Sequence, residues 1–200
     1  MEYLVTMTTH VPEGTPDEDV QEVRAREAGR SRELAAQQHL LRLWRPPLGP
    51  GEWRTLGLFA ASSDDELEKF LVSMPLHVWR TDEFTPLTPH PGDPGRQQRP
   101  GATEFLTTFT ITIPAGIPGP AVQDAEAGEA DRARELAEQG HLSRLWKLPG
   151  TGRVLGLWQA RNLAEMQTIV ASLPRAPAMK TQITPLTPHP SDPVRVGRPA

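Results

Sequence analysis

The chain has 200 residues, of which 37% are hydrophobic and 23% charged, and its formal net charge is −4. This composition is typical of a globular protein in water, and the lack of cysteine excludes disulfides, thiol catalysis and cysteine-ligated metals. No basic run indicates nucleic-acid binding and no stretch reaches transmembrane length, so no membrane association is expected and a cytoplasmic location is the default.

The sequence contains an internal repeat. Residues 24–44 read RAREAGRSRELAAQQHLLRLW, and residues 126–146 read EAGEADRARELAEQGHLSRLW. The repeat predicts two domains, at residues 1–95 and 104–200, joined by a Pro/Gly-rich linker at 96–103. A domain of about 95 residues is large enough to bury a core of its own.

Hydrophobic periodicity and turn residues predict the same six elements in each repeat, in the order β-α-β-β-α-β. The second copy lies 102 residues after the first, and a shorter hairpin reduces this offset to 99 residues. In the first repeat we expect a strand at 2–12, a helix at about 17–38 with Asp17 as N-cap, strands at 39–45 and 53–61, a helix at 63–73 capped by Ser63, and a strand at about 80–87. In the second we expect a strand at 104–114, a turn with Gly116 and Pro118, a helix, a hairpin ending at 153–160, a helix capped by Asn162, and a strand at 179–186.

This order is the split β-α-β motif of ferredoxin-like folds. The predicted fold class is therefore α+β, with two ferredoxin-like repeats forming a dimeric α+β barrel within one chain. We expect the helices on one face of each sheet. The opposite face, to which the alternation assigns Tyr3, Val5 and Met7, is expected to be covered by the sheet of the other repeat.

The long helix of each repeat carries an acid on its apolar stripe. Glu27 and Glu129 occupy positions where an amphipathic helix would have an aliphatic residue. A carboxylate withdrawn from water has a raised pKa, which suits proton transfer near neutrality, so both are candidate catalytic residues. The alternative is a structural ion pair with the arginine three residues on, Arg30 or Arg132.

Other side chains near the helix exit are candidates for substrate binding. The basic side chains suit a substrate carboxylate, with surface ion pairing as the alternative. The histidines suit a proton shuttle, with structural hydrogen bonding as the alternative. The tryptophans suit a cavity wall, with core packing as the alternative. Two further histidines, His90 and His189, are interpreted as anchors of the Pro-rich tails, and no histidine spacing predicts a metal site. The candidates are Arg42, Arg45, Arg144, Lys147, Trp44, Trp146, His39 and His141.

The order and spacing of several short segments resemble muconolactone delta-isomerase. The resemblance covers nearly the whole of each repeat, so the chain looks like two fused subunits. In the first repeat the matching residues are Val5, Met7, Thr8 and Pro12, Glu27, Leu43-Trp44-Arg45, Met74-Pro75-Leu76 and His90-Pro91. In the second they are Thr110 and Pro114, Glu129, Leu145-Trp146-Lys147, Leu173-Pro174 and His189-Pro190.

The resemblance implies a cofactor-independent isomerase that moves a double bond in a small unsaturated lactone by carboxylate-mediated proton transfer. It implies no metal and no organic cofactor. It also implies a homo-oligomer, because the family's ring of ten single domains corresponds to five of these chains.

The chain departs from the family at two places. A His-Tyr pair in the hairpin is replaced by Glu52-Trp53 and Thr151-Gly152, and an aromatic segment is replaced by residues 77–80 and 176–179. Two alternatives therefore stay open. One is a cofactorless enzyme of another reaction type, such as a cyclase or an oxygenase, and the other is a non-catalytic, ligand-binding fused pair. A closed interface without a cavity at Glu27 would favour the non-catalytic pair.

Overall fold

The computed structural model describes residues 1–95, 102–112 and 119–196, and the side chains of 119–123 and 196 lie outside this description. Most of the expected linker, the turn containing Gly116 and Pro118, and the end of the strand expected at 104–114 therefore fall outside the described residues. Within the described ranges, no helix is long and apolar enough to cross a membrane.

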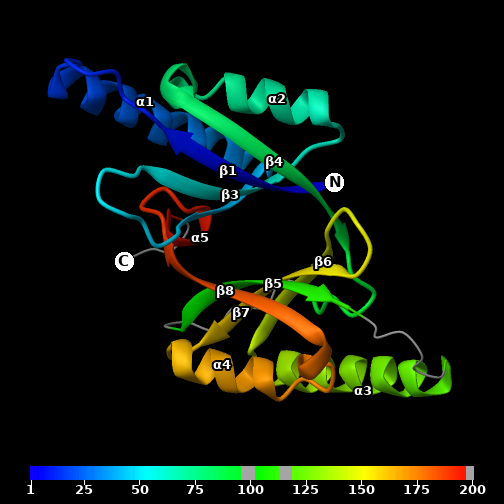
Figure 1. Ribbon diagram of the computed structural model, residues 1–200. Coiled ribbons are helices and arrows are strands. Elements are labelled where there is room, and N and C mark those ends of the chain that lie inside the picture. The colour runs from blue at the N-terminus through cyan, green and yellow to red at the C-terminus, as the bar shows by residue number, and fades with distance from the viewer. Residues whose placement is uncertain (96–101, 113–118, 197–200) are drawn as a thin grey trace. The chain divides into compact units, whose positions relative to one another are not determined.

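The elements follow the predicted order in both repeats (Figure 1). Those of the first repeat are β1 (Glu2–Thr9), α1 (Asp17–Ala36), β2 (Leu40–Arg45), β3 (Arg54–Ala60), α2 (Asp64–Val72), the 3-10 helix η1 (Pro75–Trp79) and β4 (Arg80–Pro89). Those of the second are β5 (Thr103–Ile111), α3 (Gly119–Glu138), β6 (Leu142–Lys147), β7 (Arg153–Ala160), α4 (Leu163–Ala171), η2 (Ala176–Ala178), β8 (Met179–Pro188) and α5 (Pro193–Val196).

All strand pairs are antiparallel. In the first repeat β1 pairs with β3 and β4, and β3 with β2; in the second β5 pairs with β7 and β8, and β7 with β6. The ends of β4 and β8 add two short pairings, β4 with β6 and β8 with β2. The hydrogen-bonded order is then closed, β1-β3-β2-β8-β5-β7-β6-β4, and the predicted α+β barrel fold class is confirmed.

The chain forms two compact units that exchange their tails. Unit 1 consists of Met1–Leu87 with Thr187–Ala200, and unit 2 of Thr88–Leu186. These units differ from the division at 96–103 expected from the repeat, because the tail that ends each repeat belongs to the unit built on the other repeat. Each short strand pairing at the ends of β4 and β8 therefore lies inside one unit.

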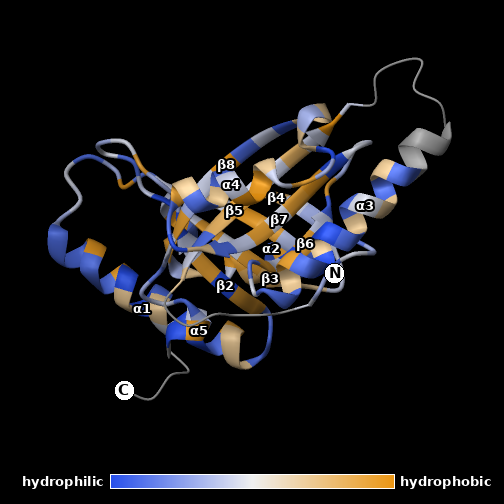
Figure 2. Ribbon diagram, turned by 90° about the horizontal axis from the view of Figure 1, so that it is seen from below, coloured by the Kyte–Doolittle hydropathy of each residue, from blue (hydrophilic) through white to orange (hydrophobic). Residues whose placement is uncertain are grey.

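Helices cover the strands within each unit. In unit 1, Leu34 of α1 and Leu67 of α2 share a buried cluster with the alternate residues Tyr3, Val5 and Met7 of β1. The expectation that these three side chains occupy the face away from the helices is therefore wrong, since the helices supply the leucines that bury them. Figure 2 shows the same division, with apolar colouring concentrated on the strands and hydrophilic residues along the helices.

The helix starts follow the predicted capping chemistry at two places and differ at a third. Ser63 and Asn162 each accept a hydrogen bond from the backbone N–H three residues on, as predicted for the caps of α2 and α4. Asp17, however, is the first residue of α1 and not its N-cap; the N-cap position is Pro16, whose side chain cannot cap. The acids of this first turn remain favourable there, because the helix dipole stabilises negative charge.

Equivalent glycines in β3 and β7 make room for a buried ring. A Cβ atom on Gly57 would lie 2.5 Å from Cε2 of Phe59, and one on Gly156 would meet Nε1 of Trp158 and lie 2.9 Å from Oγ1 of Thr107. Phe59 and Trp158 are almost completely buried, so neither ring has space to move away.

We therefore expect Gly57→Ala and Gly156→Ala each to lower the free energy of unfolding by about 1–3 kcal/mol through overpacking. Gly29→Ala in α1 is the control, because its Cβ atom would meet nothing closer than Nη2 of Arg32 at 3.9 Å. That variant should be stabilised by about 0.5–1 kcal/mol, since alanine favours a helix. Urea unfolding of the three variants measures these changes, and equal stability of all three would contradict the steric argument.

Candidate functional site

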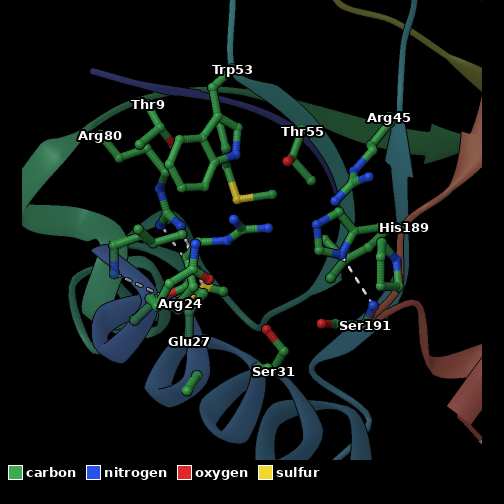
Figure 3. A pocket seen from close by; sticks show the side chains of 18 residues that line it. Thr9, Arg24, Glu27, Ser31, Arg45, Trp53, Thr55, Arg80, His189 and Ser191 are labelled. Carbon is green, nitrogen blue, oxygen red and sulfur yellow. Dashed lines mark hydrogen bonds and ion pairs between the residues drawn. The ribbon is translucent and has the colours of Figure 1, made fainter. Parts of the chain in front are cut away.

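Unit 1 contains a cavity of about 320 Å³ beside Glu27, called cavity 1 below. Its floor is formed by α1, its walls by strands β1 to β4 and η1, and its far side by the tail that follows β8 (Figure 3). The volume lies at the lower end of the range for small-molecule sites. The lining residues are Met7, Thr9, Gln21, Arg24, Ala25, Glu27, Ala28, Ser31, Leu43, Arg45, Trp53, Thr55, Met74, Leu76, Arg80 and His189–Ser191.

Glu27 is held in place by two hydrogen bonds. Its Oε2 accepts from the backbone N–H of Leu76 at 2.8 Å, and its Oε1 accepts from Nη1 of Arg80 at 2.9 Å. The side chain keeps 13% of its surface exposed and lines cavity 1. Each oxygen has a second lone pair, so the fixed carboxylate retains acceptor capacity toward a ligand.

Arg80 links Glu27 to a second acid. Its guanidinium donates to both oxygens of Asp82, at 2.6 and 3.0 Å, and also to the carbonyl oxygen of Leu71 at 3.3 Å. Its side chain is only 2% exposed, so the pairing with two carboxylates balances a buried charge. Arg30, the alternative ion-pair partner of Glu27, instead binds Glu33 and Ser73.

The environment raises the pKa of Glu27. Burial, which disfavours the charged carboxylate, is the largest cause, and Asp82 acts in the same direction. The hydrogen bond from Leu76 and the charge and hydrogen bond of Arg80 oppose this shift without cancelling it. The carboxyl group is therefore better suited to exchanging protons near neutrality than an exposed glutamate.

Two further arginines make cavity 1 attractive to anions. Figure 3 shows Arg24 reaching from α1 toward the centre of the cavity and Arg45 entering from β2. Arg24 lies over the ring of Trp53 at 5.4 Å, and within the described ranges neither arginine is paired with a carboxylate. Burial and these two charges lower the pKa of His189 to about 4, so its ring is neutral at pH 7.

The tails that complete the two units are anchored by ion pairs, which are buried in unit 1 and partly buried in unit 2. In unit 1, Nε and Nη2 of Arg42 donate to Asp192 at 3.1 and 3.0 Å, and Leu43 N donates to the same carboxylate at 3.1 Å. Asp192 is fully buried. In unit 2, Arg144 and the backbone N–H of Leu145 bind Asp93 in the same way. The aspartates share this role with the histidines predicted to anchor the tails, since the backbone N–H groups of His189 and His90 donate to the carbonyl oxygens of Leu43 and Leu145 at 3.0 and 3.1 Å.

The rings of His90 and His189 also hold the backbone of the tails. The Nδ1 atom of each ring accepts a hydrogen bond from a tail N–H two residues on, that of Gly92 or Ser191, at 3.1 Å. Each ring lines the cavity of its unit.

Unit 2 contains a larger cavity of about 590 Å³ beside Glu129, called cavity 2 below. The Oε2 of Glu129 accepts a hydrogen bond from the backbone N–H of Arg175 at 3.0 Å. No guanidinium contacts this carboxylate among the described residues. Burial raises the pKa of Glu129, and only Arg175 opposes the shift, through its N–H and its charge. Arg132, the expected alternative partner, instead binds Glu135 and Ser172.

Most of the other candidate residues lie away from the cavities. Arg42 and Arg144 hold the tails, and their guanidinium groups lie 4.7 and 4.6 Å from the ring centres of Trp44 and Trp146, which are 1% exposed. His39 and His141 interact through Nδ1 with the carbonyl oxygens of Ala60 and Gln159. Of the eight substrate-binding candidates, Arg45 lines cavity 1, the other seven line neither cavity 1 nor cavity 2, and Lys147 is exposed. Their placement favours the structural alternatives for all but Arg45 and Lys147.

Sequence reasoning missed three residues of cavity 1: Arg24, Arg80 and His189. Arg80 belongs to a segment that differs between the repeats, and its pairing across η1 with Glu27 spans 53 residues. Arg24 precedes Glu27 by almost one helical turn, a spacing that signals a shared face. No group of three or more metal-ligating side chains occurs within the described ranges.

The closed antiparallel sheet and the helix-borne acid beside each cavity define a protein of the dimeric α+β barrel class. Chlorite dismutase from Candidatus Nitrospira defluvii shares this fold, with a TM-score of 0.62 over 94% of this chain and 92% of that one, at 12% identity.

Sequence comparison identifies the family. The pattern of muconolactone delta-isomerase matches residues 1–93 and 103–192, so the chain belongs to the muconolactone delta-isomerase family. The enzyme of that name from Cupriavidus pinatubonensis (strain JMP 134 / LMG 1197) is 28% identical over 87 residues, which are 44% of this chain and 95% of the relative. Muconolactone Delta-isomerase 1 of Acinetobacter lwoffii is 32% identical over 87 residues, 44% of this chain and 91% of the relative. Each relative thus corresponds to one repeat.

Asp192→Ala tests the buried anchor of unit 1. The change leaves the charge of Arg42 without this carboxylate, and we expect the free energy of unfolding to fall by about 3 kcal/mol. Asp131→Ala removes an exposed i,i+3 pair with Arg134 and serves as control, with an expected change within about 0.5 kcal/mol. Thermal and urea unfolding measure both. A loss no larger than that of the control would show that the tail is not held by this pair.

Proposed function

We propose that unit 1 is a cofactor-independent isomerase that moves a double bond in a small unsaturated lactone carrying a carboxylate, with Glu27 as the proton-transfer group. The observation that carries the proposal is the combination in cavity 1 of a partly buried acid with a raised pKa and two arginines unpaired with carboxylates among the described residues. Membership of the muconolactone delta-isomerase family supports the reaction class.

Binding in this proposal depends on the charges of the cavity. Arg45 binds the substrate carboxylate at the end of cavity 1 near the tail. The ring of His189 in this tail is neutral, so the charge that attracts the carboxylate there is that of Arg45. Arg24, which points to the centre of the cavity, holds the lactone oxygen. The lactone ring lies against Met7, Leu43 and Trp53, which give the cavity its apolar walls.

Proton transfer then needs one carboxylate and no added reagent. Glu27 removes a proton from a ring carbon next to the existing double bond, and the electron pair of the broken C–H bond shifts into the conjugated lactone to give a dienolate. Arg24 stabilises the negative charge that collects on the lactone oxygen. Glu27 returns the same proton to the ring carbon next to the lactone carbonyl, which restores the carbonyl and leaves the double bond in its new position and the enzyme unchanged.

The cavity counts against a non-catalytic pair that has lost its pocket. Such a pair would have a closed interface at Glu27, whereas a cavity of small-ligand size lies there. A pair that binds a ligand without turnover is distinguished by the activity assay below. A different cofactorless reaction would use the same acid and arginines, so it is distinguished by its substrate. The sequence assigns Glu129 the same proton-transfer role, and this stays a prediction for unit 2.

In the Glu129→Gln background, in which unit 2 does not contribute, Glu27→Gln should reduce turnover of muconolactone by about 10²–10⁴-fold, because the amide cannot accept the proton. Proton NMR of the substrate in D₂O follows both isomerisation and exchange of the ring hydrogens. Glu129→Gln is the matched variant in unit 2 and reports what that unit contributes to total turnover. Full activity of Glu27→Gln in that background would overturn the proposed role of this residue.

The pH dependence of kcat gives a separate test. Glu27 must be ionised to accept a proton, so activity should rise with pH through its raised pKa, above the usual value of 4.5. Arg80→Met places the residue of unit 2 at this position and removes a charge and a hydrogen bond that lower the pKa of Glu27. The acidic limb should therefore move to higher pH, as a pH–rate profile measures. An acidic limb at the same pH in the variant would show that a group other than Glu27 causes it.

A further inference from the structure

At equivalent positions, the lining of cavity 2 is less polar than that of cavity 1. Thr9 and Thr55, which line cavity 1, correspond to Ile111 and Val154 in cavity 2. The strand registers establish the equivalence, since Thr9 and Ile111 pair with Arg80 and Met179, and Thr55 and Val154 pair with Met7 and Phe109. On the helix, Ser31 corresponds to Ala133. Three hydroxyl groups of cavity 1 are thus replaced by hydrocarbon.

Two arginines that line cavity 1 are also replaced in cavity 2. Met179 occupies the position of Arg80, and Glu126 the position of Arg24, so cavity 2 lacks both of these guanidinium groups. Arg175 enters the lining in place of Leu76, but it lies 3.6 Å from Glu126, and Arg134 pairs with Asp131 at 2.7 Å. The arginines that line cavity 2 therefore already have carboxylate partners.

The apolar part of cavity 2 suits a flat ring. Trp158 donates Nε1–H to Thr107 at 2.8 Å, so its polar atom is satisfied and its ring faces the cavity as hydrocarbon. Phe109 packs edge-on against it with ring centres 6.2 Å apart. The volume of about 590 Å³ exceeds the 320 Å³ of cavity 1, so a larger ligand fits.

We infer that cavity 2 is a second ligand site, and that it takes an uncharged, largely apolar ring compound with one hydrogen-bonding group, such as a substituted phenol. Glu129 is the polar contact: it lines the cavity, and its carboxyl group binds the hydroxyl of the ligand. A carboxylate ligand is disfavoured because it would enter an apolar wall beside an acid, where no unpaired arginine of the described residues receives it. This inference concerns unit 2 and does not depend on the isomerase activity proposed for unit 1.

The test uses the full chain, isothermal titration calorimetry at pH 7, and two probes of matched shape, 4-ethylphenol and 4-ethylbenzoate. Ala133→Phe fills cavity 2, and Ser31→Phe is the equivalent change in cavity 1. We expect Ala133→Phe to raise the Kd of the phenol at least tenfold and Ser31→Phe to leave it unchanged. In the Ser31→Phe protein, which leaves cavity 2 open, the phenol should bind at least tenfold more tightly than the benzoate.

Three results would overturn the inference: no binding of the phenol by the unmodified chain, equal phenol affinity with cavity 2 filled, or equal affinity of Ser31→Phe for the two probes. Met179→Arg gives a second variant in case Ala133→Phe does not fold, as circular dichroism shows. It introduces the guanidinium of unit 1 beside Glu129 and should weaken phenol binding at least fivefold, whereas unchanged affinity would count against the inference. A chain without isomerase activity that shows the expected phenol pattern still supports the second site.

Discussion

The architecture depends on two ion pairs that hold the tails, one buried and one partly buried. Arg42 and Arg144 lie in strands β2 and β6, where a cation without an acid would be very costly. Asp192 and Asp93 supply that acid, and each also accepts a backbone N–H from the strand beside it. The positions of His189 and His90 follow, because each lies only three residues before its aspartate and lines the cavity of the unit to which its tail belongs.

The fold was predictable from the sequence because the patterns that indicate it are local and occur in both repeats. Alternation gave the strands, the helix stripe gave α1 and α3, and the caps at Ser63 and Asn162 gave the starts of two helices. The face of Tyr3 was predicted wrongly because alternation separates two faces of a strand without saying which one meets the helices. That choice is decided by Leu34 and Leu67, residues distant in the sequence.

The candidate site was predictable in part for the same reason. Glu27 stands out as an acid on an apolar stripe, a local pattern. The residues that complete the site around it are non-local: its ion-pair partner Arg80 comes from β4, and His189, which lines the same cavity, comes from the end of the other repeat. Arg42 attracted attention because both repeats keep it, yet repetition marks a shared structural need as readily as a shared reaction. The tail pairs are such a need.

The exchange of tails makes unit 1 the product of two distant parts of the gene, whereas unit 2 is one continuous segment. Residues 189–191 line cavity 1 although they are encoded at the end of the second repeat, and residues 90–94, from the end of the first repeat, line cavity 2. A frameshift or stop near codon 187 would therefore damage the first unit and spare most of the second. Fusion also keeps each tail tethered at high effective concentration to its acceptor. The two repeats can therefore diverge in the ligands that they bind. A substitution in the tail of one repeat nevertheless alters the cavity of the unit built on the other repeat.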